Sequence, residues 1–156
     1  NYTSDRALWW FTRDSCISRT LIQAFETIDI DLLYASHFLL RDIREQVESD
    51  QCQQWLHLYR TQLMSTSELK KLKESIGEMI SIDTFLATSP RRERMVQLLK
   101  ETTPEKTMQR VLFQIDLDPR RIHYRVCGDI STYHYYTGTR TILFMPGSVF
   151  YPIDIA

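Results

Sequence analysis

Arg60 is a candidate for chemistry, because it ends a short run of apolar and aromatic residues, 55–59. A guanidinium at the end of such a strand can hold a phosphate through two parallel hydrogen bonds. The competing interpretation is an arginine at the rim of a sheet that pairs with a surface carboxylate. Its position alone favours the interpretation as a rim arginine. Binding of an anion by Arg60 stays a hypothesis at this point.

Thr88 and Ser89 form a second candidate, since they follow an apolar run and precede a proline that can open a helix. Hydroxyls at that point can hydrogen-bond a ligand, and the free N–H groups of a helix N-terminus attract anions. Arg91 and Arg92 add positive charge to the same turn. Ser89 can also serve as a plain N-cap, which is the commoner role, and the two roles are compatible.

The tetrad Tyr133-His134-Tyr135-Tyr136 is a dense aromatic cluster at the start of a predicted loop, Tyr133–Gly138. Exposed aromatic side chains on a loop can stack on a planar ligand or dock to a protein partner. The tyrosines can equally cover core strands and keep their hydroxyls in water. The two interpretations weigh about the same.

Other kinds of site find no support in the sequence. The three cysteines are scattered without metal-ligand spacing, so we expect no metal, and reduced thiols suggest the cytoplasm. No histidine pair has metalloprotease spacing and no serine lies in a nucleophile elbow. A net charge of -1 argues against a nucleic-acid partner. No apolar run approaches the ~20 residues of a membrane span.

Hydrophobic periodicity predicts the elements that must position these residues. Residues 1–50 predict a helical lobe of two helices that are separated at Asp29-Ile30-Asp31, which can cap the second helix. Residues 51–156 predict a β-rich core. The strands are expected at 55–60, 79–87, 111–115, 122–126, 141–145 and 148–153. Further helices are expected after the capping box at Ser65 and from Ser89-Pro90 onward. A length of 156 residues suits one such α+β domain, which we expect to be cut from a longer protein.

These segments, in this order, resemble the R-S-E group of mono-ADP-ribosyltransferases, most nearly the eukaryotic type often joined to tetratricopeptide repeats. The resemblance rests on blocks spread over nearly the whole chain: Phe11-Thr12-Arg13-Asp14-Ser15, Leu58-Tyr59-Arg60-Thr61-Gln62, 81–89, 111–116, 128–131 and 142–150. It implies a split β-sandwich with an N-terminal helical lobe, and NAD as the substrate or ligand in a cleft between the sheets. The implied chemistry is glycosyl transfer.

The resemblance also implies roles for single residues. Arg60 would hold the phosphates of NAD, Thr88 and Ser89 would be the last two residues of the group's Ser-Thr-Ser element, and Ala87 would replace its first serine. The loop Tyr133–Gly138 would face a protein substrate. The implied cofactor-binding residues are Arg60, Thr61, Ala87, Thr88, Ser89, Arg91 and Arg92, and the implied substrate-loop residues are Tyr133, Tyr135 and Tyr136.

The chain departs from the group where the reaction takes place. The group's Glu-x-Glu motif precedes the strand matched by Ile142-Leu143-Phe144, and here the triplet is Thr139-Arg140-Thr141. In the group, the last glutamate stabilises the cationic ribose as nicotinamide leaves, and the earlier one prepares the acceptor. Thr139 and Thr141 carry no charge, and no glutamate follows Glu105. Losing one preorganised electrostatic group commonly costs ~3–4 kcal/mol, or ~10²–10³ in rate.

Three functions stay open on the sequence alone. The first is an ADP-ribosyltransferase-like pseudoenzyme that keeps a cleft for NAD or a related nucleotide but has lost, or nearly lost, transfer to protein. The second is an active mono-ADP-ribosyltransferase or NAD glycohydrolase that uses an unconventional carboxylate. The third is a protein-interaction module that binds through the tyrosine loop. The first leads, because Arg60 and Thr88-Ser89 are retained while both glutamates are not.

Overall fold

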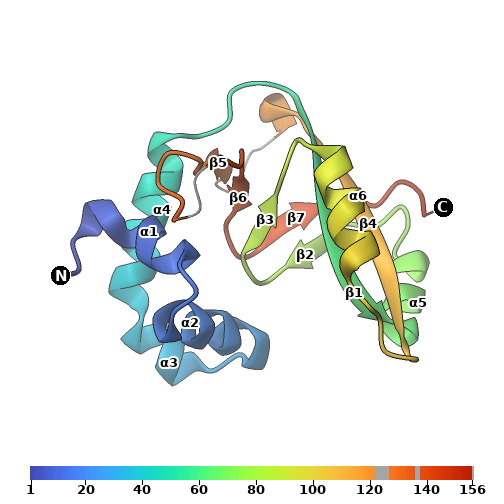
Figure 1. Cartoon of the computed structure of the whole chain (residues 1–156), viewed down its shortest axis with the longest axis horizontal. Coiled ribbons are helices and arrows are strands. Elements are labelled where there is room, and N and C mark those ends of the chain that lie inside the picture. Colours follow the sequence, from blue (N-terminus) through green and yellow to red (C-terminus); the bar gives the residue numbers. More distant parts are fainter. Residues whose placement is uncertain (122–126, 136–137, 156) are drawn as a thin grey trace.

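The computed structural model describes residues 1–121, 127–135 and 138–155. Figure 1 shows the helices within residues 4–49 gathered at the N-terminal side, and the strands together with the later helices on the other side. A short 3-10 helix η1 (Ser4–Arg6) leads into the helical lobe. Its α-helices are α1 (Ala7–Thr12), α2 (Cys16–Thr27), α3 (Ile30–Ala35) and α4 (His37–Ser49). Along the described residues, no helix combines the length and apolar character that crossing a membrane takes.

The prediction of two helices in the lobe was wrong, because short polar residues start additional ones. Ser15 begins α2 with a capping box, in which its hydroxyl accepts a hydrogen bond of 3.3 Å from the Ser18 N–H. Asp29 caps α3 by accepting 3.0 Å from the Leu32 N–H, as predicted. Ser36 then leaves helical geometry at φ -94 and ψ 5, which separates α3 from α4.

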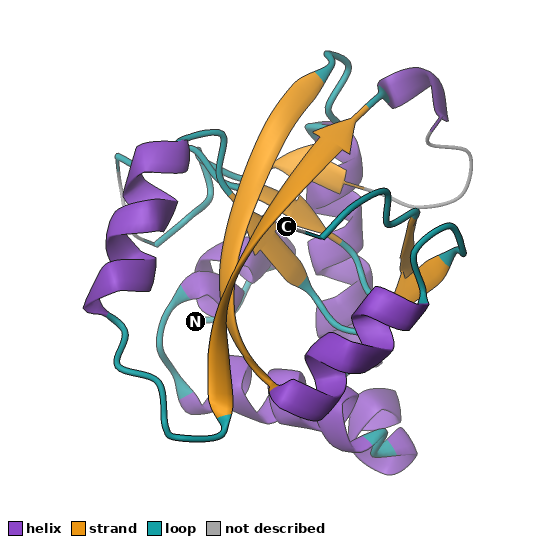
Figure 2. Cartoon of the chain, turned by 90° about the vertical axis from the view of Figure 1, so that its right-hand side faces the viewer, coloured by secondary structure: helices purple, strands orange, loops and turns teal. Residues whose placement is uncertain are grey.

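Two long strands, β1 (Leu56–Ser65) and β4 (Met108–Leu117), pair antiparallel from Leu56↔Leu117 to Ser65↔Met108. Both are longer than predicted. Figure 2 shows them as a twisted ribbon with a helix on either side. These helices are α5 (Thr66–Glu74) and α6 (Arg92–Glu101). The predicted capping box at the start of α5 is confirmed, since Ser65 and Glu68 exchange hydrogen bonds.

The remaining described strands form two short antiparallel sheets. One has the order β3 (Leu86–Thr88), β6 (Ile142–Phe144), β5 (Cys127–Asp129), and the other pairs β2 (Ile80–Ile82) with β7 (Ser148–Phe150). The single strand predicted at 79–87 was therefore wrong. It is split because Phe85 turns into the core, where its ring centroid lies 4.4 Å from that of Phe11. The strand predicted at 122–126 lies outside the described residues.

Strand β6 is the central wall of the molecule, because its side chains alternate between two cores. Leu143 packs with the helical lobe, while Ile142 and Phe144 pack on the side of β1 and β4. The lobe-side core comprises Ala7, Leu8, Phe11, Leu21, Leu39, Ile43, Val47, Phe85, Ile130 and Leu143. The sheet that contains β6 thus lies between the lobe and the long ribbon.

The lobe approaches this sheet through main-chain contacts at Gly128. The Asp129 N–H donates to the Asp50 carbonyl at 2.9 Å, and the Cys52 N–H donates to the Cys127 carbonyl at 3.2 Å. A Cβ on Gly128 would lie 2.9 Å from the Asp50 carbonyl oxygen and closer still to that of Val47. Only glycine permits this approach, which sets the position of α4 against β5.

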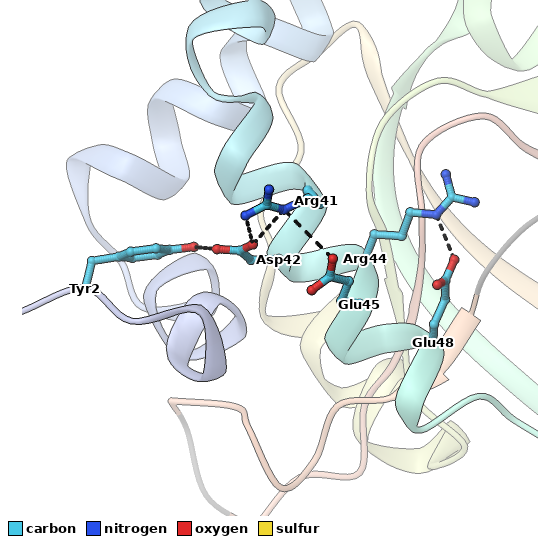
Figure 3. Close-up of polar contacts among 6 residues, drawn as sticks. All are labelled: Tyr2, Arg41, Asp42, Arg44, Glu45 and Glu48. Atoms are coloured by element: carbon cyan, nitrogen blue, oxygen red, sulfur yellow. Dashed lines mark hydrogen bonds and ion pairs between the residues drawn. The ribbon is translucent and has the colours of Figure 1, made fainter.

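A buried carboxylate, Asp42 on α4, holds the N-terminal segment to the lobe (Figure 3). It accepts a hydrogen bond of 2.7 Å from the Tyr2 hydroxyl and one of 3.0 Å from the Arg41 guanidinium. The hydrogen bond from Tyr2 lowers the pKa of Asp42 below its usual range, and Arg41 adds to this against the opposing effect of burial. The neighbouring Arg44–Glu48 ion pair in Figure 3 is exposed and contributes little.

Candidate functional site

A pocket of about 260 Å³ opens between the helical lobe and the wall formed by β1, β3 and β6. Apolar side chains such as Phe11, Phe85 and Leu143 form much of its lining. The polar residues that line it are Thr12, Glu26, Arg60, Thr84, His134 and Thr141. Among the described residues, no group of three potential ligands could hold a metal ion.

Arg60 lies in the wall of this pocket with part of its hydrogen-bonding capacity unused. Two backbone hydrogen bonds join strand β1 to the segment after β3. The Tyr59 N–H donates to the Ser89 carbonyl at 2.8 Å, and the Ser89 N–H donates to the Tyr59 carbonyl at 2.9 Å. This places Arg60 beside Ala87, whose carbonyl accepts 3.0 Å from Arg60 Nη1. Its Nε is buried and has no hydrogen-bond partner among the described residues. Burial lowers the pKa of Arg60.

The rim interpretation of Arg60 required a surface carboxylate as partner, and no described carboxylate pairs with it. A buried donor without a partner costs about 1–3 kcal/mol, and more when the group is charged. An anion bound in the pocket would remove that cost. The arrangement is therefore that of an arginine prepared for an anionic ligand.

Thr88 and Ser89 are buried and do not line the pocket. Thr88 Oγ1 donates 2.9 Å to the Ile142 carbonyl, which ties β3 to β6. Ser89 Oγ accepts 3.2 Å from the Arg91 N–H. The N-cap of α6 is Arg91, so the prediction that Ser89 caps this helix with Pro90 in its first turn was wrong. The two hydroxyls position β3, and through it Ala87, which does line the pocket.

Thr141 is the member of the Thr139-Arg140-Thr141 triplet that lines the pocket. Two hydrogen bonds hold its main chain. The Thr141 N–H donates to the Ser131 hydroxyl at 3.1 Å, and the Ile130 N–H donates to the Thr141 carbonyl. Asp129, the nearest carboxylate in sequence, is engaged by the Ser131 hydroxyl and by Arg140 Nε at 2.9 Å. Burial alone would raise the pKa of Asp129, but these hydrogen bonds lower it below its usual range. Asp129 thus organises the loop and does not line the pocket.

The tyrosine loop is fastened to the helical lobe of its own chain. The Tyr133 hydroxyl donates 2.6 Å to Asp50, and the Tyr135 N–H donates 2.9 Å to the Thr12 hydroxyl. The Tyr135 ring also meets Trp9 edge to face, with centroids 5.4 Å apart. Tyr136 lies outside the described residues. Of the residues in this region, Thr12 and His134 line the pocket.

The sequence matches no family model and no curated protein. Solved structures do match. The Vis toxin, an ADP-ribosyltransferase from Vibrio splendidus, has a TM-score of 0.67 at 16% identity over 96% of this chain and 65% of that chain. Vis in complex with the M6 inhibitor has a TM-score of 0.72 at 18% identity over 100% of this chain and 68% of that chain. For the Salmonella SpvB ATR domain, the TM-score is 0.60 at 17% identity over 96% of this chain and 78% of that chain.

The chain has the ADP-ribosyltransferase fold. It spans 65% of the length of the Vis toxin chain. The α+β architecture predicted from the sequence, with its N-terminal helical lobe, is confirmed. The neighbours named here are bacterial, and the affiliation with eukaryotic, tetratricopeptide-linked proteins stays a prediction.

The ADP-ribosyltransferase fold brings together three of the residues that the sequence nominated. Arg60, Ala87 and Thr141 come from different strands or strand ends and line one pocket. The nominated residues outside its lining are Thr61, Thr88, Ser89, Arg91, Arg92, Tyr133, Tyr135 and Thr139.

Glu26 lines the pocket but was missed in the sequence, whereas His134, which also lines it, was noted as part of the aromatic tetrad. Ile22 and Glu26 are one turn apart on α2 and so share a helix face. Glu26 lies in the last turn of α2, where the helix dipole favours a cation over a carboxylate. The sequence could have indicated Glu26 only through this unfavourable position in the helix. Its relevance to a site becomes visible only in the fold, where α2 and Arg60 line the same pocket.

Proposed function

We propose that the chain is an ADP-ribosyltransferase-like domain that binds NAD or a related nucleotide in the pocket and is impaired in transfer to protein. One observation carries the proposal: the buried Nε of Arg60 has no hydrogen-bond partner among the described residues, and Arg60 forms no ion pair with a described carboxylate. A phosphate oxygen would satisfy it in a charge-assisted hydrogen bond. The pocket volume of about 260 Å³ suits part of a dinucleotide, since whole small-molecule sites measure roughly 300–1,000 Å³.

Impairment follows from the neutral side chains of Thr139 and Thr141 at the positions that the resemblance assigns to glutamates. A hydroxyl at Thr141 can hydrogen-bond a ribose but cannot offset a full positive charge. A structure of Vis contains agmatine, whose guanidinium resembles that of arginine. In this chain a protein acceptor at the Tyr133–Gly138 loop would meet Thr139, which cannot prepare it by taking a proton.

A second function, slow hydrolysis of NAD, is favoured by one observation. Glu26 places an acidic side chain in the pocket that also holds Arg60 and Thr141. Hydrolysis needs water as the acceptor and therefore does not need the missing residue that prepares a protein acceptor.

Titration of NAD by calorimetry tests the binding proposal. We expect saturable binding by the wild type and its loss in Arg60→Ala. The control is Arg110→Ala, which removes an exposed arginine of β4 that hydrogen-bonds the Thr102 carbonyl. Equal affinity in wild type and Arg60→Ala, or no binding by either, would contradict the proposal.

A further inference from the structure

Glu26 and Arg60 carry opposite charges and line the same pocket from different layers of the fold, α2 and β1. Within the described part of the chain, neither forms an ion pair. A cation and an anion that face one cavity without neutralising each other suit a ligand that has charges of both signs. NAD has this distribution, with an anionic pyrophosphate and a cationic pyridinium ring.

Glu26 is the acidic residue among those that line the pocket. Its side chain is exposed and has no hydrogen-bond partner among the described residues, so its oxygens are available to a ligand. Asp129 and Asp50 do not line the pocket, and both are already engaged, Asp129 by Ser131 and Arg140 and Asp50 by Tyr133.

We propose that Glu26 supplies the carboxylate that acts on the nicotinamide ribose of NAD, a role that rests on the proposed NAD binding. The bond between ribose C1′ and the pyridinium nitrogen breaks, and its electron pair leaves with neutral nicotinamide. The positive charge then spreads over C1′ and the ring oxygen, where the Glu26 carboxylate stabilises it. Water adds to C1′ and gives up one proton, first to Glu26 and then to solvent. The products are nicotinamide, ADP-ribose and one proton.

The local position of Glu26 separates this role from a structural one. A carboxylate in the last turn of α2 opposes the helix dipole, so removing its charge should leave the melting temperature unchanged or slightly higher. A residue retained for stability would show the reverse.

The test compares the wild type with Glu26→Gln, which keeps the shape and removes the charge. Glu45→Gln is the matched control, because it removes an exposed carboxylate of the same lobe outside the pocket. Each protein is assayed for NAD affinity by calorimetry, for nicotinamide release by chromatography and for melting temperature. We expect Glu26→Gln to bind NAD, to melt at or above the wild-type temperature and to release nicotinamide roughly 100-fold more slowly. Glu45→Gln should match the wild type.

The outcomes separate the two proposals. If NAD binds and nicotinamide release is absent from the wild type, or equal in wild type and Glu26→Gln, the role of Glu26 is overturned while the binding function stands. If the wild type does not bind NAD, the binding function fails and the role of Glu26 fails with it. A slower Glu26→Gln that also melts at a lower temperature would overturn a direct role in favour of a structural one.

Discussion

Arg60 Nη1 donates a hydrogen bond of 3.0 Å to the carbonyl oxygen of Ala87, across the boundary between β1 and β3. This contact holds one arm of the guanidinium, while the buried Nε stays without a partner among the described residues. The planar fork is therefore oriented before any ligand arrives, and less side-chain entropy is lost on binding.

Arg60→Lys should bind NAD more weakly although it keeps the charge. A lysine ammonium cannot keep the contact with Ala87 and present a second, coplanar donor to a phosphate. We expect a loss of about 1.5–3 kcal/mol, or roughly 10–150-fold in Kd by calorimetry. Arg44→Lys, on the exposed face of α4, is the control. Unchanged affinity would show that Arg60 acts as a point charge only.

Thr141→Glu should raise nicotinamide release, because it returns a carboxylate to a position that lines the pocket. We expect an increase on the order of 100-fold. Thr139→Glu should leave hydrolysis unchanged, since Thr139 does not line the pocket, and Thr141→Gln separates charge from shape. Similar rates for Thr141→Glu and Thr141→Gln would count against electrostatic impairment.

Tyr2→Phe should lower the stability of the lobe in a pH-dependent way. The variant loses the hydrogen bond to Asp42, which we expect to cost about 1 kcal/mol at pH 7, at the low end for a charged acceptor because Tyr2 is 37% exposed. The pKa of folded Asp42 is lowered, so this stabilisation is complete above the unfolded pKa of about 4 and is lost as pH falls through the folded value. Urea unfolding at neutral and acidic pH should show the difference between wild type and variant shrinking below about pH 4. A gap that stays constant across this range would contradict the assignment.

Tyr133→Phe should destabilise the chain by about 1 kcal/mol, because it removes the hydrogen bond to Asp50. This differs from the hypothesis of a tyrosine loop that serves a partner alone, which predicts no change in stability. Chemical denaturation measures the effect. In the Asp50→Asn background, Tyr133→Phe should lower the free energy of unfolding by less than it does in the wild type. If the effects of the two substitutions on that free energy are fully additive, the two side chains do not interact.

Gly128→Ala should push the lobe away from the sheet and lower the stability of the chain considerably. Its Cβ would meet the Asp50 and Val47 carbonyl oxygens, which are main-chain atoms and cannot move aside. We expect a loss of at least about 2 kcal/mol in thermal or chemical unfolding. Gly138→Ala offers a contrast, because its Cβ would meet nothing within 4 Å and it carries only the strain of φ +91. Equal costs for the two variants would contradict close packing at Gly128.

The sequence predicted those features that depend on neighbouring residues. Ser65 and Glu68 form their capping box, and Asp29 caps its helix, because both signals act within one helical turn. The split between β2 and β3 was missed, because the apolar residues within 79–87 do not reveal that Phe85 leaves the strand for the lobe.

The pocket was only partly predictable for the same reason. Arg60 and Thr141 belong to sequence blocks that resemble a known group, so they could be nominated in advance. Glu26 belongs to no such block, and its place in the lining depends on how α2 packs against the sheet. Cytoplasmic location and a protein partner stay predictions.

Strand β6 faces two cores at once, with Leu143 on one side and Ile142 and Phe144 on the other. A change of volume there would disturb packing in both directions, so this strand has little freedom to reshape the pocket. Residues of the lobe that reach the pocket from one side, such as Ile22, are under no such double constraint. Variation in ligand preference is therefore most easily accommodated on the helical side.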